Sequence, residues 1–130
     1  MAGFTNFSED LVLDFLFTAS TATRPTAWYV ALYTVAPGEA GGGTECSGTS
    51  YVRQSASFTV SGTAPSQAAN SAAVEFPTAG GSWGTIVAAG VFDALSSGNL
   101  LAYADLTTSK TIDTGDVLRF NTGTLIVTLD

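Results

Sequence analysis

The segment from residue 27 to residue 34 constrains the fold of this chain most strongly, because its large side chains alternate with a period of two. The bulky residues divide between the two faces as Trp28, Val30 and Leu32 on one side, and Tyr29, Ala31 and Tyr33 on the other. A period of two is the side-chain period of a β-strand and not of a helix. The segment is therefore predicted to be a strand with bulky residues on both faces.

The chain after Arg24-Pro25 continues as short strand-like runs separated by turn residues. The breaks carry Gly, Pro, Asn, Asp and Ser, the residues that turns require. The predicted strands are residues 27–34, 51–60, 71–76, 84–93, 99–106, 117–121 and 124–129. Seven to eight short strands with regular turns predict a mainly β protein, an antiparallel, jelly-roll-like β-sandwich. The last two strands are expected to form a hairpin across Thr122-Gly123.

One α-helix is predicted, at residues 7–19, and it precedes all of these strands. Ser8 is the expected N-cap, with acidic residues in the first turn. The apolar residues of this helix spread nearly around its surface: Leu11, Val12, Leu13, Phe15, Leu16 and Phe17. A helix of this kind has to be buried on more than one side. We expect it to plug one end of the sandwich, with packing against a neighbouring subunit as the alternative.

Size and charge limit the class of protein. With 130 residues, of which 45% are hydrophobic, residues 1–130 are expected to form a single domain. Eleven acidic and four basic residues give a net charge of −7, which repels phosphate backbones, so no nucleic acid is expected as a partner. The four cations are scattered and the apolar run from Leu11 to Phe17 is interrupted by Asp14. We therefore expect no membrane binding, no signal peptide and no membrane anchor.

The residue types argue against catalysis. The chain has no histidine, which removes the commonest general base and metal ligand. Lys110 lies in a hydroxyl-rich segment, residues 107–111, expected between strands, where a lowered pKa is not favoured. The single Cys46 follows Glu45, whose charge opposes thiolate formation. Neither residue has the surroundings of a nucleophile.

Other candidate sites have simpler interpretations. Asp113 and Asp116 are typical of a tight turn and lack the spacing of a calcium loop. The sequence leaves open whether two of the carboxylates of Glu75, Asp93 and Asp105 lie close together, as the catalytic pair of a glycosidase does. The sequence thus predicts no enzyme, no catalytic residue, no metal site and no cofactor.

A glycine-rich loop at residues 35–50 is the clearest candidate for contact with a partner. Its glycine run lacks the lysine of a phosphate-binding loop and is bracketed by Glu39 and Glu45, so it is not expected to bind phosphate. The glycines are therefore expected to provide either flexibility or close approach of the backbone to another group. Aromatic residues are interpreted as core or interface anchors, with a sugar-binding platform of Trp28, Tyr29 or Trp83 as the alternative. The candidate partner contacts are Leu11, Phe15, Glu39, Gly41, Gly42, Gly43, Tyr51 and Trp83.

Several segments, in order along nearly the whole chain, resemble a family of small phage virion proteins of the tail-fibre-like type. These segments are residues 10–17, 25–34, 37–45, 51–54, 76–79, 83–85, 91–94, 98–101, 106–111 and 125–130. The resemblance implies a bacteriophage structural protein without enzymatic activity, located on the virion surface after synthesis in the host cytoplasm.

The resemblance also implies partners. The expected role is an accessory subunit that decorates or stabilises the particle, either as a capsid cement protein or in association with a tail fibre. Its partners would be major capsid or tail proteins and further copies of itself, with a trimer as the expected homo-oligomer. The alternative function is a receptor-binding module that recognises a host surface glycan.

Overall fold

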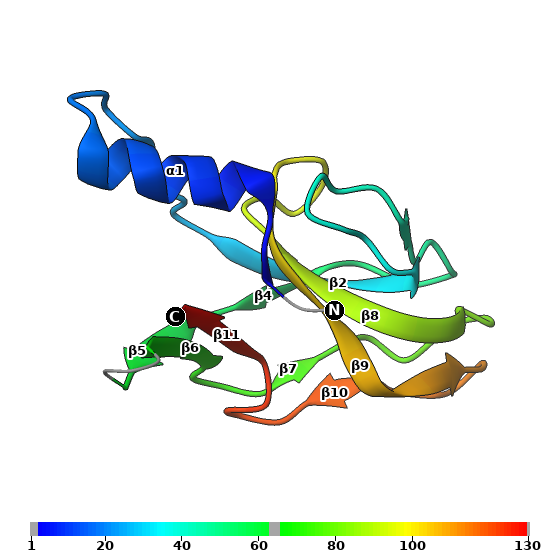
Figure 1. Ribbon diagram of the computed structural model, residues 1–130. Coiled ribbons are helices and arrows are strands. Elements are labelled where there is room, and N and C mark those ends of the chain that lie inside the picture. The colour runs from blue at the N-terminus through cyan, green and yellow to red at the C-terminus, as the bar shows by residue number, and fades with distance from the viewer. Residues whose placement is uncertain (1–2, 63–65, 130) are drawn as a thin grey trace.

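The computed structural model describes residues 3–62 and 66–129, and in this part of the chain it contains one helix and eleven strands (Figure 1). The helix is α1 (Asn6–Phe17). The strands are β1 (Gly3–Phe4), β2 (Trp28–Val35), β3 (Thr44–Glu45), β4 (Gln54–Ala56), β5 (Phe58–Ser61), β6 (Ser66–Asn70), β7 (Val74–Glu75), β8 (Gly84–Phe92), β9 (Leu100–Ile112), β10 (Arg119–Phe120) and β11 (Ile126–Leu129). The predicted mainly β, antiparallel, sandwich-like fold with one helix is confirmed, although the strands are more numerous and often shorter than expected.

One large sheet forms the centre of the molecule. Its strand order is β1-β9-β8-β2-β3, with β4 also paired to β2, and every pairing is antiparallel. Two small sheets, β10-β7 and β11-β6-β5, lie below it in Figure 1, and α1 lies above it. The large sheet is therefore covered from two sides by different kinds of structure.

Strand β2 has buried side chains on both faces, as its alternation predicts. On the inner face, toward the small sheets, Val30 and Leu32 belong to a core cluster that also contains Phe76, Trp83 and Ile86. On the outer face, Ala31 and Tyr33 pack with residues of β8 and β9 in a second cluster, namely Ala88, Phe92, Leu100 and Tyr103. Burial of apolar surface on both faces makes this strand the centre of the fold.

The expected C-terminal hairpin is wrong. Strand β10 pairs with β7, with Arg119 opposite Glu75, whereas β11 pairs with β6. The buried side chain of Asn70 accounts for the change of direction, because its Nδ2 donates to the Asn121 carbonyl at 3.0 Å and its Oδ1 accepts from the Leu125 amide at 2.9 Å. Fixed between these two bonds, the chain leaves one small sheet and enters the other.

The segment expected between strands, residues 107–111, is instead part of β9. This strand is thirteen residues long and pairs with β8 as far as Ile112 opposite Gly84. The hydroxyl groups of Thr85 and Thr111 lie 3.1 Å apart across the pair. Threonine is favoured on such a half-exposed strand surface, so the hydroxyl-rich composition is compatible with a strand.

The helix also differs from its prediction. It begins at Asn6 and ends at Phe17, and Ser8 is not its N-cap: the Ser8 hydroxyl donates to the Leu101 carbonyl of β9 at 2.7 Å. Thr5 donates to the Leu100 carbonyl of the same strand. These bonds attach the first turn to β9, and the last turns extend beyond the sheet (Figure 1). Because Phe15 and Phe17 are 74% and 77% exposed, the expectation that the helix plugs the sandwich is wrong.

Candidate interaction surface

Three segments meet above the outer face of the large sheet: the start of α1, the glycine-rich loop at residues 36–43 and the β8–β9 loop at residues 93–99 (Figure 1). The Asn6 amide donates to the Glu39 carbonyl at 2.9 Å and so joins the helix to the glycine-rich loop. A hollow of about 510 Å³ lies between them, lined among others by Phe7, Glu39 and Asn99. We refer to α1 and these two loops as the contact surface.

The glycine-rich loop has a defined shape. It connects β2 to β3, and within it Gly38 and Gly41 exchange two backbone hydrogen bonds of 2.9 Å around a tight turn. Gly43 has a φ of +71°, and a Cβ there would lie 2.5 Å from the Val35 carbonyl oxygen. Any other residue at position 43 would be strained and would collide with the backbone. Of the two roles left open for these glycines, close backbone approach is therefore the one seen at Gly43.

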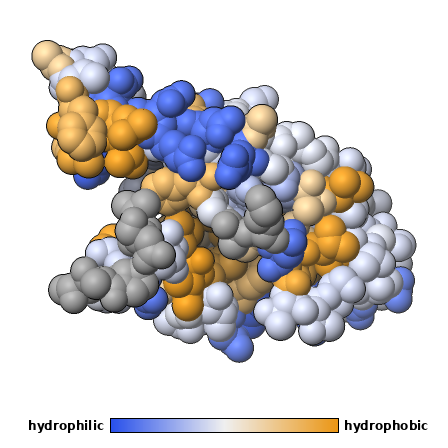
Figure 2. All heavy atoms as spheres, viewed as in Figure 1, coloured by the Kyte–Doolittle hydropathy of each residue, from blue (hydrophilic) through white to orange (hydrophobic). Residues whose placement is uncertain are grey.

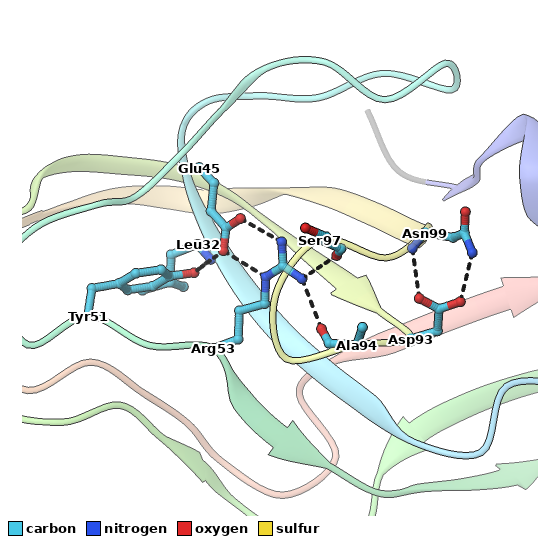
Figure 3. Close-up of polar contacts among 8 residues, drawn as sticks. All are labelled: Leu32, Glu45, Tyr51, Arg53, Asp93, Ala94, Ser97 and Asn99. Carbon is cyan, nitrogen blue, oxygen red and sulfur yellow. Dashed lines mark hydrogen bonds and ion pairs between the residues drawn. The ribbon is translucent and has the colours of Figure 1, made fainter.

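An ion pair between a buried arginine and a partly buried glutamate fixes the base of this loop (Figure 3). Glu45 of β3 accepts two hydrogen bonds from Arg53, at 2.9 Å from Nε and 2.8 Å from Nη2. The Tyr51 hydroxyl donates to the same carboxylate at 2.7 Å and accepts from the Leu32 amide at 3.1 Å. Arg53 is only 8% exposed, and its guanidinium carbon lies 3.6 Å from the centre of the Phe92 ring. Bidentate geometry and an aromatic face are the surroundings that favour a buried arginine.

The same arginine also fixes the β8–β9 loop. Its Nη1 donates to the carbonyl oxygens of Ala94 and Ser97, at 2.9 and 2.8 Å. Within that loop, Asp93 accepts from the backbone and the side-chain nitrogen of Asn99, at 2.7 and 2.9 Å (Figure 3). One buried side chain therefore holds both loops of the contact surface on the sheet.

The ionisation of the cluster follows from its contacts. Burial alone would raise the pKa of Glu45, but the hydrogen bonds from Arg53 and Tyr51 outweigh it and hold the pKa below its usual value. The hydrogen bonds to Glu45 raise the pKa of Arg53. Burial, with the nearby Glu45 charge, raises the pKa of Tyr33 to about 12 and also raises that of Tyr51. The cluster is thus an ionised pair with neutral tyrosines, which suits a structural role.

The predicted contact residues fall into two groups. Leu11 and Phe15 on α1, with Glu39, Gly41, Gly42 and Gly43 in the loop, all belong to the contact surface. Tyr51 and Trp83 do not, because their side chains lie on the inner side of the sheet. The Tyr51 ring stacks on Phe76 and meets Trp83 edge to face.

The placement of Trp83 corrects its interpretation as an exposed contact. The residue is 4% exposed and its Nε1 donates to the Thr49 carbonyl at 2.9 Å. The indole occupies space left by Gly48, where a Cβ would lie 2.2 Å from Trp83 Cδ1. Trp83 is therefore a core residue in this chain.

The role of Arg53 was not predicted from the sequence, in which it is one of four scattered cations. The available signal was the pair Glu45 and Arg53 in a chain with only 12% charged residues, close to a strand rich in aromatic residues. In such a chain each charged side chain has few oppositely charged side chains with which it can form an ion pair. The contacts to Ala94 and Ser97 had no signal, because they depend on the tertiary fold.

Cys46 is buried, and burial raises the pKa of its thiol. Residues 3–62 and 66–129 contain no group of three or more Cys, Asp or Glu side chains that could hold a metal ion. The described part of the chain also has no helix of the length and hydrophobicity needed to cross a membrane.

The family described as podophage GP4 fiber I protein gp80 matches residues 3–128, which is nearly the whole chain. No curated protein matches the chain.

Proposed function

The chain belongs to the family of podophage GP4 fiber I protein gp80, and from this premise we propose that it is a structural subunit of a phage tail fibre that attaches to other virion proteins through the contact surface. The family membership supports a tail-fibre-like phage protein as the sequence resemblance implied. The proposal assigns the protein no catalytic residue and no cofactor.

One observation carries this proposal: the exposed apolar free end of α1, a helix whose first turn is fixed to β9 and to the glycine-rich loop. Leu13, Phe15, Leu16 and Phe17 are all more than half exposed at this end of the helix. Contiguous apolar surface of this kind marks a site of protein–protein contact in soluble proteins. The first turn of this helix is bonded to β9 and to the glycine-rich loop, so a partner would meet a projection that needs little ordering on binding.

The two other roles receive less support. Capsid decoration was an expectation of the resemblance, whereas the matching family is described as a fibre protein. Glycan binding through Trp28, Tyr29 or Trp83 loses one of its three residues, because the indole of Trp83 is buried. We therefore propose the tail fibre as the location of the protein.

The test is to locate the protein in purified virions. Gold-labelled antibody and electron microscopy should place it on tails, and mass spectrometry of separated tails and emptied capsids should find it with tails. Phage carrying Phe15→Ser should incorporate less of the subunit, because the contact surface loses an exposed aromatic ring. Val60→Ser, which removes an exposed apolar side chain from β5, is the matched control and should incorporate normally. Absence of the protein from virions, or its presence on capsids alone, would overturn the proposal.

A further inference from the structure

A groove separates the large sheet from the small sheets at one end of the sandwich. It has a volume of about 590 Å³ and is lined by residues of both layers. Large apolar side chains line the small-sheet side, among them Phe120, Leu125 and Ile126, and Ile126 is exposed. A groove of this size and lining is suited to apolar side chains from another molecule.

The groove exists because the large sheet carries small residues there. Ala89 lies opposite Ala104, and Val91 lies opposite Ala102, so these alanines share the inner face of β8 and β9. We call this the open end of the sandwich. At the other end, which we call the packed end, Phe76, Trp83 and Ile86 fill the space between the layers. The chain therefore fills the space between the layers at one end and leaves a groove at the other.

The same chain carries an apolar projection that its own fold leaves uncovered. Figure 2 shows hydrophobic atoms at the free end of α1, beyond the main body. They belong to the last turns of the helix, where Leu16 is 61% and Phe17 is 77% exposed. The first turn is bonded to β9 through Thr5 and Ser8, which directs this end away from the sheet.

The projection is acidic, whereas the groove carries charges of both signs. Helix α1 carries Glu9, Asp10 and Asp14 and no basic residue. Two of the four cations of the chain, Lys110 and Arg119, line the groove, together with the acidic Asp105, and Arg119 is paired with Glu75 at 3.4 Å. An acidic helix whose Asp14 approaches Lys110 gains an attraction that helps to fix its orientation.

We propose that the free end of α1 of one copy inserts into the open end of a second copy of this chain. The inference deepens the proposed function and rests on it, because it names the partner for one part of the contact surface. The two contacting patches differ, so the interface is heterologous and repeats head to tail. Such contacts close into a ring, for example the expected trimer, or continue as a filament.

The first experiment measures self-association of the full chain by sedimentation velocity and light scattering over a range of concentrations. The wild type should form oligomers. The double variant Leu16→Ser/Phe17→Ser should raise the dissociation constant on the order of 30-fold, as loss of one interface hot spot does. The matched control Val60→Ser should associate like the wild type. A wild type that stays monomeric at all concentrations would overturn the inference.

The second experiment changes the groove instead of the helix. Ala104→Leu adds apolar volume at the open end and should also prevent assembly, with circular dichroism and thermal unfolding to verify that it folds. Because a folding defect would obscure this result, the exposed charge variant Lys110→Glu is measured as well. It should weaken association, and combination with Asp14→Lys should restore it.

Mixing the variants gives the sharpest test. The helix variant retains a normal groove, and the groove variant retains a normal helix. A mixture of the two should form heterodimers and nothing larger, because one competent contact remains in each pair. Failure to form heterodimers would contradict a head-to-tail contact. Normal presence on tails together with a monomeric purified protein would overturn this inference and leave the proposed function intact.

Discussion

The packed end and the open end of the sandwich use the same two layers in opposite ways. At the packed end, Phe76 and Trp83 are almost fully buried, and the Tyr51 ring lies between them and the Glu45–Arg53 pair. At the open end, Ala89 and Ala104 leave a groove between the sheets. The ion pair at this end, Arg119 with Glu75, has a distance of 3.4 Å and is more than half exposed.

The difference assigns stability to one end of the sandwich and interaction to the other. Dense packing and the Glu45–Arg53 ion pair at one end hold the fold and the loops together. Unfilled apolar space at the other end contributes less to stability and is available to a partner. Paired substitutions at the two ends test this division.

The largest effect is expected for truncation of an aromatic core residue. Phe76→Ala at the packed end should lower the free energy of unfolding by about 3–5 kcal/mol, because it removes a buried ring and leaves a cavity. Phe58→Ala at the open end should cost about 1–2 kcal/mol, because that ring is only half-buried beside the groove. Chemical denaturation of both variants measures the difference. Equal losses would contradict the division.

The two ion pairs should differ almost as much. Arg53→Ala removes a buried guanidinium and leaves the partly buried Glu45 carboxylate without its partner, and it should cost about 3 kcal/mol. Arg119→Ala breaks an exposed pair and should cost at most about 1 kcal/mol. The same denaturation measurement compares them. If Arg53→Ala lowered the free energy of unfolding as little as Arg119→Ala does, the Glu45–Arg53 pair would not hold the loops.

Added volume should be tolerated at one end only. Gly48→Ala at the packed end brings a Cβ against the Trp83 ring and should cost about 1–3 kcal/mol. Ala104→Leu at the open end should change the free energy of unfolding by less than about 1 kcal/mol, because the new atoms enter the groove. Thermal unfolding of both variants is the measurement. A large loss for Ala104→Leu would mean that the groove cannot accept a side chain.

The smallest effect is the pH dependence of the packed end. The pKa of Glu45 is lower in the folded chain than its ordinary value of 4.5, so the unfolded chain binds more protons in this range. The contribution of Glu45 is therefore complete above pH 4.5 and is lost as the pH falls through the folded pKa. Unfolding free energies of wild type and Glu45→Gln should differ at neutral pH and converge in acid. Parallel curves would show that the pair does not contribute.

The alkaline side gives the opposite sign. Burial raises the pKa of Tyr33 from 10.0 to about 12, so its contribution is complete below pH 10 and is lost as the pH rises toward about 12. Tyr33→Phe removes the titrating hydroxyl and should flatten this part of the profile.

Local sequence patterns predicted much of the fold. The alternation around Val30 and Leu32 identified the central strand and its two buried faces, and turn residues separated most of the other strands. Strand pairing was not predictable in the same way. The hairpin expected across Thr122-Gly123 depends on a side chain more than fifty residues earlier, that of Asn70, whose amide contacts Asn121 and Leu125.

The candidate site was predictable only in part. The glycine-rich loop and α1 were found from composition and capping signals, but the exposure of the helix was not. All-round apolar character normally indicates burial, and here the uncovered surface lies beyond the end of the sheet. Trp83 was misplaced for a similar reason, since only the tertiary contact with Gly48 reveals its pocket.

The contacts of Arg53 also have a consequence for the order of folding. Its carboxylate partner is eight residues away, whereas the carbonyl oxygens of Ala94 and Ser97 are 41 and 44 residues away. Short loops close faster than long ones, so we expect the first half of the chain to form the ion pair and the second half to be captured by the remaining N–H groups. Arg53 would then join an early-folding half to a late-folding half, and φ-values higher for Glu45→Gln than for variants of the β8–β9 loop would show it.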